Sequence, residues 1–145
     1  MNQQMIFLLG GIVLAVVFAL ILRLPVVRDA SRRHAMALLV ASLIYVAFAV
    51  VGRSVGGIVV ETVGVVAFGG IALLGYRRSS PALVALGWGL HPLWDVSLHS
   101  SGAGLVYTPS GYPPLCIGFD LVLAALILLG WAGAPAGLRP AAGQV

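Results

Sequence analysis

Five long apolar stretches, separated by short polar segments, occupy most of this 145-residue chain. A helix needs about 20 predominantly apolar residues, within a range of about 17 to 25, to cross the hydrocarbon core of a bilayer. Only 8% of the residues are charged, whereas a soluble domain carries about 25%. A chain this poor in charge cannot cover its surface in water, so its expected solvent is lipid.

The apolar stretches predict an all-α fold, a polytopic membrane helix bundle with five transmembrane helices and no soluble domain. The expected helices cover residues 5–22, 35–51, 55–75, 82–99 and 115–132 of a single transmembrane domain, 1–145. Residues 133–145 are rich in Pro, Gly and Ala, and we expect a disordered tail there. No basic side chain precedes the first stretch, which favours a retained helix over a signal peptide.

The distribution of arginine predicts how the bundle is oriented. Cytoplasmic loops carry an excess of Lys and Arg, and every basic residue of this chain is Arg. The segments after the first and third apolar stretches, together with the tail, hold Arg23, Arg28, Arg32, Arg33, Arg77, Arg78 and Arg139. The opposite side holds only Arg53. We therefore expect the N-terminus outside, the C-terminus in the cytoplasm, and a multi-pass protein of the cell (plasma) membrane.

The same distribution limits the expected partners. Because the arginines lie in short clusters between apolar stretches, we expect them to set the orientation of the helices in the membrane. The net charge of +4 therefore does not indicate nucleic-acid binding. The lipid bilayer is the predicted partner. A homo-oligomer is a further option, since a chain this small often needs a second copy to enclose a pathway.

Three of the four acidic residues, Glu61, Asp95 and Asp120, lie inside expected helices. A central Asp opposes membrane insertion by about 2.5 to 3.5 kcal/mol, so three acids oppose it by roughly 8 to 10 kcal/mol before they find partners. At a rise of about 1.5 Å per residue, all three lie about 6 to 9 Å below the expected outer interface. Carboxylates at one depth on three helices predict one shared polar site.

The fourth expected helix adds two histidines to this site. His91, Asp95 and His99 are spaced four residues apart, so on an α-helix they span about 80° and form one stripe. Cys116 and Asp120 form another pair with this spacing on the fifth helix. One site can therefore draw on imidazole, carboxylate and thiol groups.

A proline interrupts the fourth helix near these histidines. Pro92 cannot donate a backbone hydrogen bond, and its ring clashes with the carbonyl of Trp88, four residues back. We expect the helix to kink or break beside His91. Such a kink serves helix packing or, equally, exposes backbone to an internal cavity.

Imidazole and carboxylate together are typical ligands of zinc, iron or manganese. The predicted ligands of one divalent ion are His91, Asp95, His99, Glu61 and Asp120. The three carboxylates are also the candidate catalytic residues, because a carboxylate can act as general base toward a metal-bound water. The predicted protein is then a metal-dependent membrane enzyme that acts on a lipid-like or small substrate.

Two other functions suit the same residues. Ionisable groups inside a membrane also mark proton or cation paths, so a relay or transport protein is one alternative. A structural accessory subunit is the other, with the polar groups hydrogen-bonded to one another to hold the bundle together. The sequence has no nucleotide, dinucleotide or haem-attachment motif, and whether the protein is an enzyme stays open at this point.

One pattern in the second half of the chain resembles a known family. Residues 90–95 (LHPLWD) and His99 are followed by residues 113–116 (PPLC) and 119–120 (FD). This pattern is similar to that of a small uncharacterised integral membrane family, number 6010 among the domains of unknown function. The resemblance covers the fourth and fifth expected helices and implies a membrane location and a small size. It implies no activity, because none is assigned to the family.

Overall fold

A computed structural model describes residues 2–24, 29–100 and 102–131. These residues form five α-helices and no strand, which confirms the all-α fold. The helices are α1 (Gln3–Leu22), α2 (Ala30–Val51), α3 (Val55–Arg77), α4 (Pro81–Trp94) and α5 (Tyr112–Leu128). A π-helical segment, η1 (Asp95–Ser100), continues α4, and a 3-10 helix, η2 (Ala103–Val106), precedes α5. Within the described part of the chain, α1, α2 and α3 are long and apolar enough to cross a membrane.

Polar side chains cap the first three helices. Asn2, Asp29 and Ser54 each accept a hydrogen bond from a backbone N–H in the first turn of α1, α2 and α3, respectively. Because Asp29 caps α2, this helix starts at Ala30 and takes in a polar first turn. The apolar stretch by itself had placed the start at residue 35.

Two prolines set the start of α5. Pro113 and Pro114 lie in its first turn, where a missing backbone N–H leaves no helical bond unmade. The helix therefore begins at Tyr112, three residues before the expected start, and the outer loop is correspondingly shorter. It ends at Leu128, and the predicted disordered tail at 133–145 lies outside the described residues.

The fourth helix becomes irregular three residues after Pro92 rather than beside His91. It remains α-helical through the proline and then adopts the i→i+5 pattern of a π-helix in η1. The backbone N–H of Asp95 bonds to the carbonyls of both His91 and Pro92. The wider turn changes the direction in which the His99 side chain points. His99 therefore does not continue the single stripe that His91, Asp95 and His99 would form on an α-helix.

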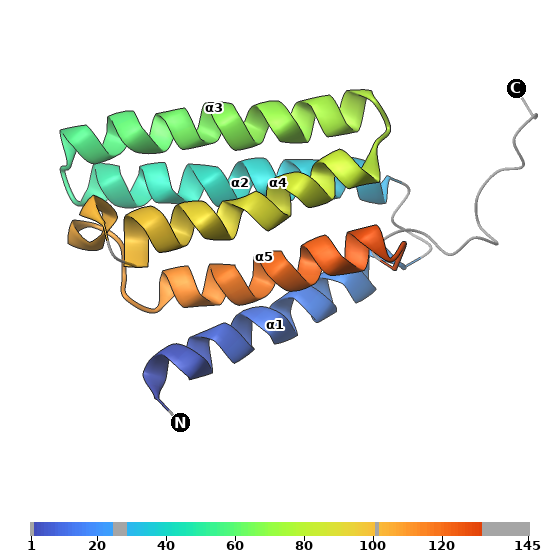
Figure 1. Ribbon diagram of the computed structural model, residues 1–145, viewed down its shortest axis with the longest axis horizontal. Coiled ribbons are helices and arrows are strands. Elements are labelled where there is room, and N and C mark those ends of the chain that lie inside the picture. The colour runs from blue at the N-terminus through green and yellow to red at the C-terminus, as the bar shows by residue number, and fades with distance from the viewer. Residues whose placement is uncertain (1, 25–28, 101, 132–145) are drawn as a thin grey trace, which may run out of the picture.

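Successive helices run in opposite directions, with α2 beside α3 and α4 beside α5, while α1 lies along α5 and runs parallel to it (Figure 1). Apolar side chains fill its centre, among them Leu38, Trp88 and Leu123. The outer surface is apolar as well, since Val66 and Leu128 are 71% and 66% exposed. By contrast, the predicted site residues are all buried, namely Glu61, His91, Asp95, His99 and Asp120.

Two glycines allow α1 and α5 to approach closely. A Cβ atom at Gly11 would overlap the carbonyl oxygen of Leu115, and one at Gly118 would overlap the carbonyl oxygen of Leu8. Small residues at such positions let helix backbones come into direct contact, which is a common way for apolar helices to associate. The close contact between α1 and α5 therefore depends on glycine at both Gly11 and Gly118.

Gly11→Val should weaken the contact between α1 and α5, because the new side chain must displace the backbone of α5. We expect a loss of about 1 to 3 kcal/mol of stability, as for other overpacked sites. Thermal unfolding in detergent, followed by circular dichroism, measures this loss. Gly10→Val is the matched control, since a Cβ at Gly10 meets nothing within 4 Å. An equal fall in both variants would contradict the close packing.

Candidate metal centre

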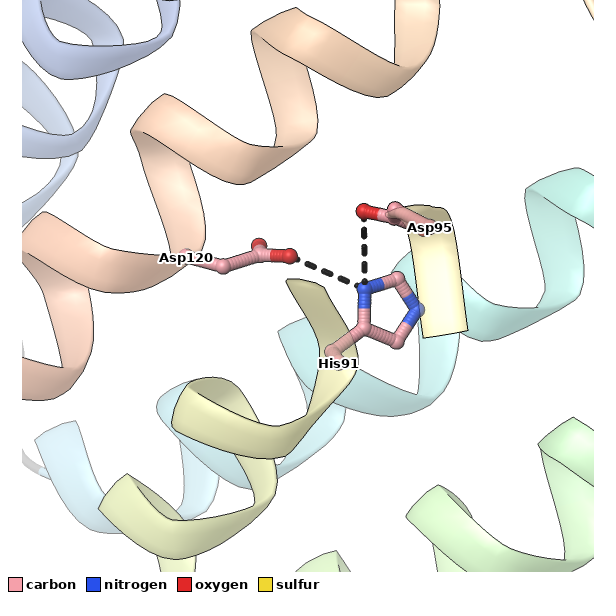
Figure 2. Close-up of side chains that lie close together, drawn as sticks. All are labelled: His91, Asp95 and Asp120. Carbon is pink, nitrogen blue, oxygen red and sulfur yellow. Dashed lines mark hydrogen bonds and ion pairs between the residues drawn. The ribbon is translucent and has the colours of Figure 1, made fainter. Parts of the chain in front are cut away.

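Three buried side chains meet between α4, η1 and α5, and we call them the metal cluster: His91, Asp95 and Asp120. Nδ1 of His91 lies 2.9 Å from Oδ2 of Asp120 and 3.6 Å from Oδ2 of Asp95. One ligand atom from each residue lies within 4.8 Å of the other two. The two carboxylates approach the same ring nitrogen from different sides (Figure 2).

The groups of the metal cluster do not satisfy one another completely. His91 is hydrogen-bonded to Asp120, but neither carboxylate oxygen of Asp95 has a hydrogen-bond partner among the described residues. Asp95 is also 0% exposed, so its oxygens do not reach the surface. A buried carboxylate without compensation costs several kcal/mol. A proton or a cation is therefore needed to neutralise the negative charge of the Asp95 carboxylate.

The donor set of the cluster fits a divalent cation. Zinc–nitrogen and zinc–oxygen bonds measure about 2.0 to 2.2 Å, so ligand atoms around a tetrahedral ion lie about 3.3 to 3.6 Å apart. The two separations at His91, 2.9 and 3.6 Å, are close to that spacing. One imidazole with two carboxylates suits zinc, iron or manganese. Three protein ligands also leave a coordination position for water or substrate.

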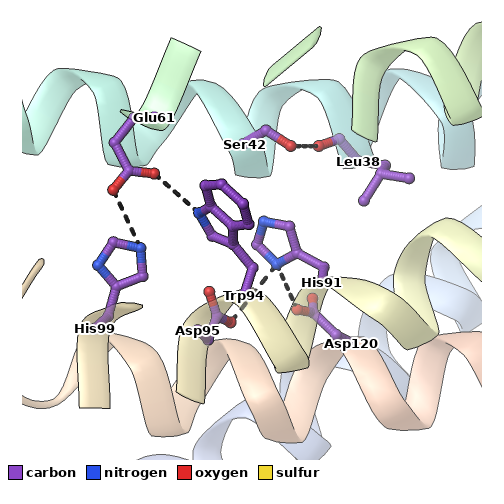
Figure 3. A network of polar contacts seen from close by, with 8 residues as sticks. All are labelled: Leu38, Ser42, Glu61, His91, Trp94, Asp95, His99 and Asp120. Carbon is purple, nitrogen blue, oxygen red and sulfur yellow. Dashed lines mark hydrogen bonds and ion pairs between the residues drawn. The ribbon is translucent and has the colours of Figure 1, made fainter. Parts of the chain in front are cut away.

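Glu61 and His99 form a second cluster, which we call the Glu61–His99 pair. Nε2 of His99 lies 3.3 Å from Oε1 of Glu61, an ion-pair distance. The indole N–H of Trp94 donates a hydrogen bond of 3.2 Å to Oε2 of the same carboxylate (Figure 3). These contacts join η1 and the last residue of α4 to α3, whereas the metal cluster joins α4 and η1 to α5.

The structure thus divides the five predicted ligands between two places. The metal cluster brings three of them together, and Glu61 and His99 lie outside the group whose atoms can share one ion. The π-helical η1 explains the division, because it directs His99 toward α3 while His91 faces α5. The common depth of the three carboxylates therefore did not place them in a single site.

The segment before α5 closes over the Glu61–His99 pair. The hydroxyl of Tyr107 donates a hydrogen bond of 2.6 Å to Glu61, and Oγ1 of Thr108 lies 3.0 Å from Nδ1 of His99. A Cβ at Gly57 would lie 2.6 Å from the Tyr107 ring, so glycine makes room for it there. Burial, followed by the adjacent Glu61 carboxylate, raises the pKa of Tyr107 above its ordinary value.

Tyr45 of α2 lies between the two clusters. Its ring stacks on His99, with centroids 3.9 Å apart and planes 9° from parallel, and its centroid is 5.9 Å from that of His91. Its hydroxyl interacts electrostatically with Asp95 and Cys116. The space beside Tyr45 that reaches both Glu61 and His91 leaves no room for a water molecule. Tyr45 thus contacts residues of both clusters.

Four partners of the two clusters are not among the site residues predicted from the sequence, namely Tyr45, Trp94, Tyr107 and Thr108. A signal existed for Tyr45 and Ser42, which are the polar side chains in the second half of an otherwise apolar α2. Buried Tyr and Trp usually find a hydrogen-bond partner for their polar atom, so these residues could have been assigned to the site.

Fold and site together define a small all-α protein with a polar centre enclosed by helices that are apolar on their outer faces. The chain belongs to a family of unknown function, DUF6010, which it matches over residues 6–136. This match confirms the family predicted from the sequence, and the matched residues include parts of all five helices. No curated protein and no solved structure matches the chain.

Glu61→Gln should lower the pKa of Tyr107, because an amide does not oppose the phenolate as a carboxylate does. We expect additional tyrosinate absorbance in E61Q at pH values where the wild type shows less. An ultraviolet pH titration in detergent measures this, and the double variant E61Q/Y107F should lose the additional absorbance. Identical titration curves for E61Q and the wild type would contradict the contact between Glu61 and Tyr107.

Proposed function

We propose that this chain is a multi-pass membrane protein in which the metal cluster holds one divalent ion. The membrane placement is supported by three helices that are long and apolar enough to cross a bilayer. In the fold, α4 and η1 together form a continuous helical segment of similar length, from Pro81 to Ser100. With the apolar outer surface, this supports a bundle in which all five helices are embedded in lipid.

The orientation of the proposed membrane protein follows from its arginines. Alternating helix directions place the described arginines Arg23, Arg32, Arg33, Arg77 and Arg78 at one end of the bundle and Arg53 at the other. We assign the arginine-rich end to the cytoplasm, as expected from the sequence. The metal cluster then faces the outer half of the membrane, below the segment that carries Tyr107 and Thr108.

The observation that carries the metal proposal is the environment of Asp95. Neither of its oxygens makes a hydrogen bond of good geometry within the described chain, its neighbours are Nδ1 of His91 at 3.6 Å and the hydroxyl of Tyr45, and a ligand atom of Asp120 lies close by. A divalent ion supplies two positive charges to two carboxylates, whereas one shared proton leaves a net charge in an apolar interior. The bound ion would act as a Lewis acid and activate a water for hydrolysis of a lipid-like or small substrate.

The two clusters have different roles in this proposal. His91, Asp95 and Asp120 hold the ion, and whichever carboxylate oxygen is not coordinated is placed to accept a proton. The Glu61–His99 pair holds the outer segment over the site through Tyr107 and Thr108. Exclusion of water by such a cover strengthens the electrostatic interactions within a site.

Protein purified without a histidine tag should contain about one divalent ion per chain, as a three-ligand site allows. We expect His91→Ala, Asp95→Asn and Asp120→Asn each to remove most of this metal. Inductively coupled plasma mass spectrometry of the purified variants measures the content and names the metal.

Two histidines outside the cluster provide controls for that measurement. His99→Ala should retain the metal, because His99 lies outside the three-residue group, and His34→Ala should retain it as well. Absence of metal from folded wild-type protein would contradict the proposal. Loss of metal in His99→Ala but not in Asp120→Asn would assign the ion to the other cluster.

A proton or cation path is the second candidate function, favoured by the position of Tyr45. Its ring stacks on His99 and its hydroxyl interacts with Asp95, so it connects the metal cluster to the pair beneath the outer segment. A relay predicts proton flux across vesicles that contain the protein and an internal pH-sensitive dye. Tyr45→Phe should abolish this flux while leaving metal content unchanged. Flux equal to that of empty vesicles would exclude the relay.

A further inference from the structure

A cleft between α1 and α2 leads from the outer surface of the bundle to the metal cluster. Helix α1 is inclined to the others, and its N-terminal end lies far from α2 (Figure 1). At the opposite end the two helices meet, where Phe18 and His34 have ring centroids 5.8 Å apart. The cleft between these limits has a volume of about 240 Å³, and α4 and α5 form its floor.

The wall of the cleft is almost entirely apolar. Leu14 and Val40 line its mouth and are 49% and 52% exposed, so in a bilayer they contact lipid chains. Trp88 and Phe119 line the interior. A ligand can therefore enter the cleft from the hydrocarbon core of the bilayer without crossing water.

The polar side chains of the cleft are three residues of α5 and Trp88 of α4, whose indole N–H has no hydrogen-bond partner among the described residues. Tyr112, Cys116 and Asp120 contribute to its lining, and Asp120 is the residue hydrogen-bonded to His91. No Arg, Lys or His side chain lines it among the described residues. A phosphate or carboxylate head group would therefore meet Asp120 without a compensating cation. A hydroxyl group, which both donates and accepts hydrogen bonds, suits the phenol, thiol and carboxylate found there.

We propose that this cleft binds the single hydrocarbon chain of a hydroxyl-bearing lipid and places its hydroxyl group at Asp120, beside the metal cluster. The volume supports one chain, since pockets for larger ligands measure about 300 to 1,000 Å³. This inference rests on the proposed function for its membrane placement and names the substrate class of the same site.

Quenching of Trp88 by bromine tests the occupancy of the cleft. The protein is reconstituted with Trp131→Phe as background, and dibrominated stearyl alcohol is titrated into the bilayer. We expect saturable quenching that unbrominated stearyl alcohol reverses and that Trp88→Phe abolishes. Dibrominated octadecane, which lacks the hydroxyl, should bind about tenfold more weakly, equivalent to one hydrogen bond to a charged group.

Three variants test whether the saturable quenching of Trp88 results from lipid bound in the cleft. Ala41→Phe fills its interior and Val40→Phe narrows its mouth at an exposed position, so both should reduce the affinity at least tenfold. Ala67→Phe, on an exposed face of α3, is the matched control and should bind like the parent. Quenching that does not saturate, or that persists unchanged in Val40→Phe, would overturn the inference.

Metal content, measured on the same samples, separates this inference from the proposed function. A parent protein that holds metal but shows no saturable quenching contradicts the lipid site alone. A parent protein without metal that still shows saturable quenching contradicts the metal centre and supports the lipid site. Val40→Phe should retain its metal, because it lies outside the metal cluster.

Discussion

The buried charge of Asp95 is the constraint on which the polar centre depends. A carboxylate surrounded by apolar helices is stable only when a proton, a cation or hydrogen-bond donors compensate it. His91 is the nearest such group, but it is shared with Asp120, and one imidazole cannot fully compensate two carboxylates. This imbalance distinguishes the metal cluster from the Glu61–His99 pair, where Tyr107 and Trp94 donate hydrogen bonds to the single carboxylate.

Much of the fold was predictable from the sequence, because an apolar environment restricts both the length of the helices and the placement of charged residues. Apolar stretches of sufficient length predicted five helices, and the cost of buried charge predicted that the acidic residues would find partners. Helix starts were less predictable, since Asp29 extends α2 through a polar turn that hydropathy alone excludes. The division of the site was not predictable at all. It depends on η1, and no rule of spacing places a π-helical turn three residues after Pro92.

The two clusters are close in the fold but differ in what they join. The metal cluster ties α4 and η1 to α5, and the Glu61–His99 pair ties η1 to α3 and to the segment before α5. Tyr45 contacts both, from a helix that contributes no charged group to either. A change in one cluster can therefore reach the other through packed aromatic side chains, Tyr45, Phe68 and Trp94, without a continuous chain of water molecules.

The close packing of α1 on α5 has a consequence for how the chain assembles. Of the five described helices, the earliest in the sequence, α1, packs mainly on the latest, α5, so their glycine-lined contact cannot form until α5 has been synthesised. Contacts between parts of a chain that are distant in sequence also form slowly, because closing the intervening loop costs entropy. In the proposed membrane placement, α1 is surrounded by lipid until then, and the cleft beside it is a place where a lipid chain can remain after the bundle has closed.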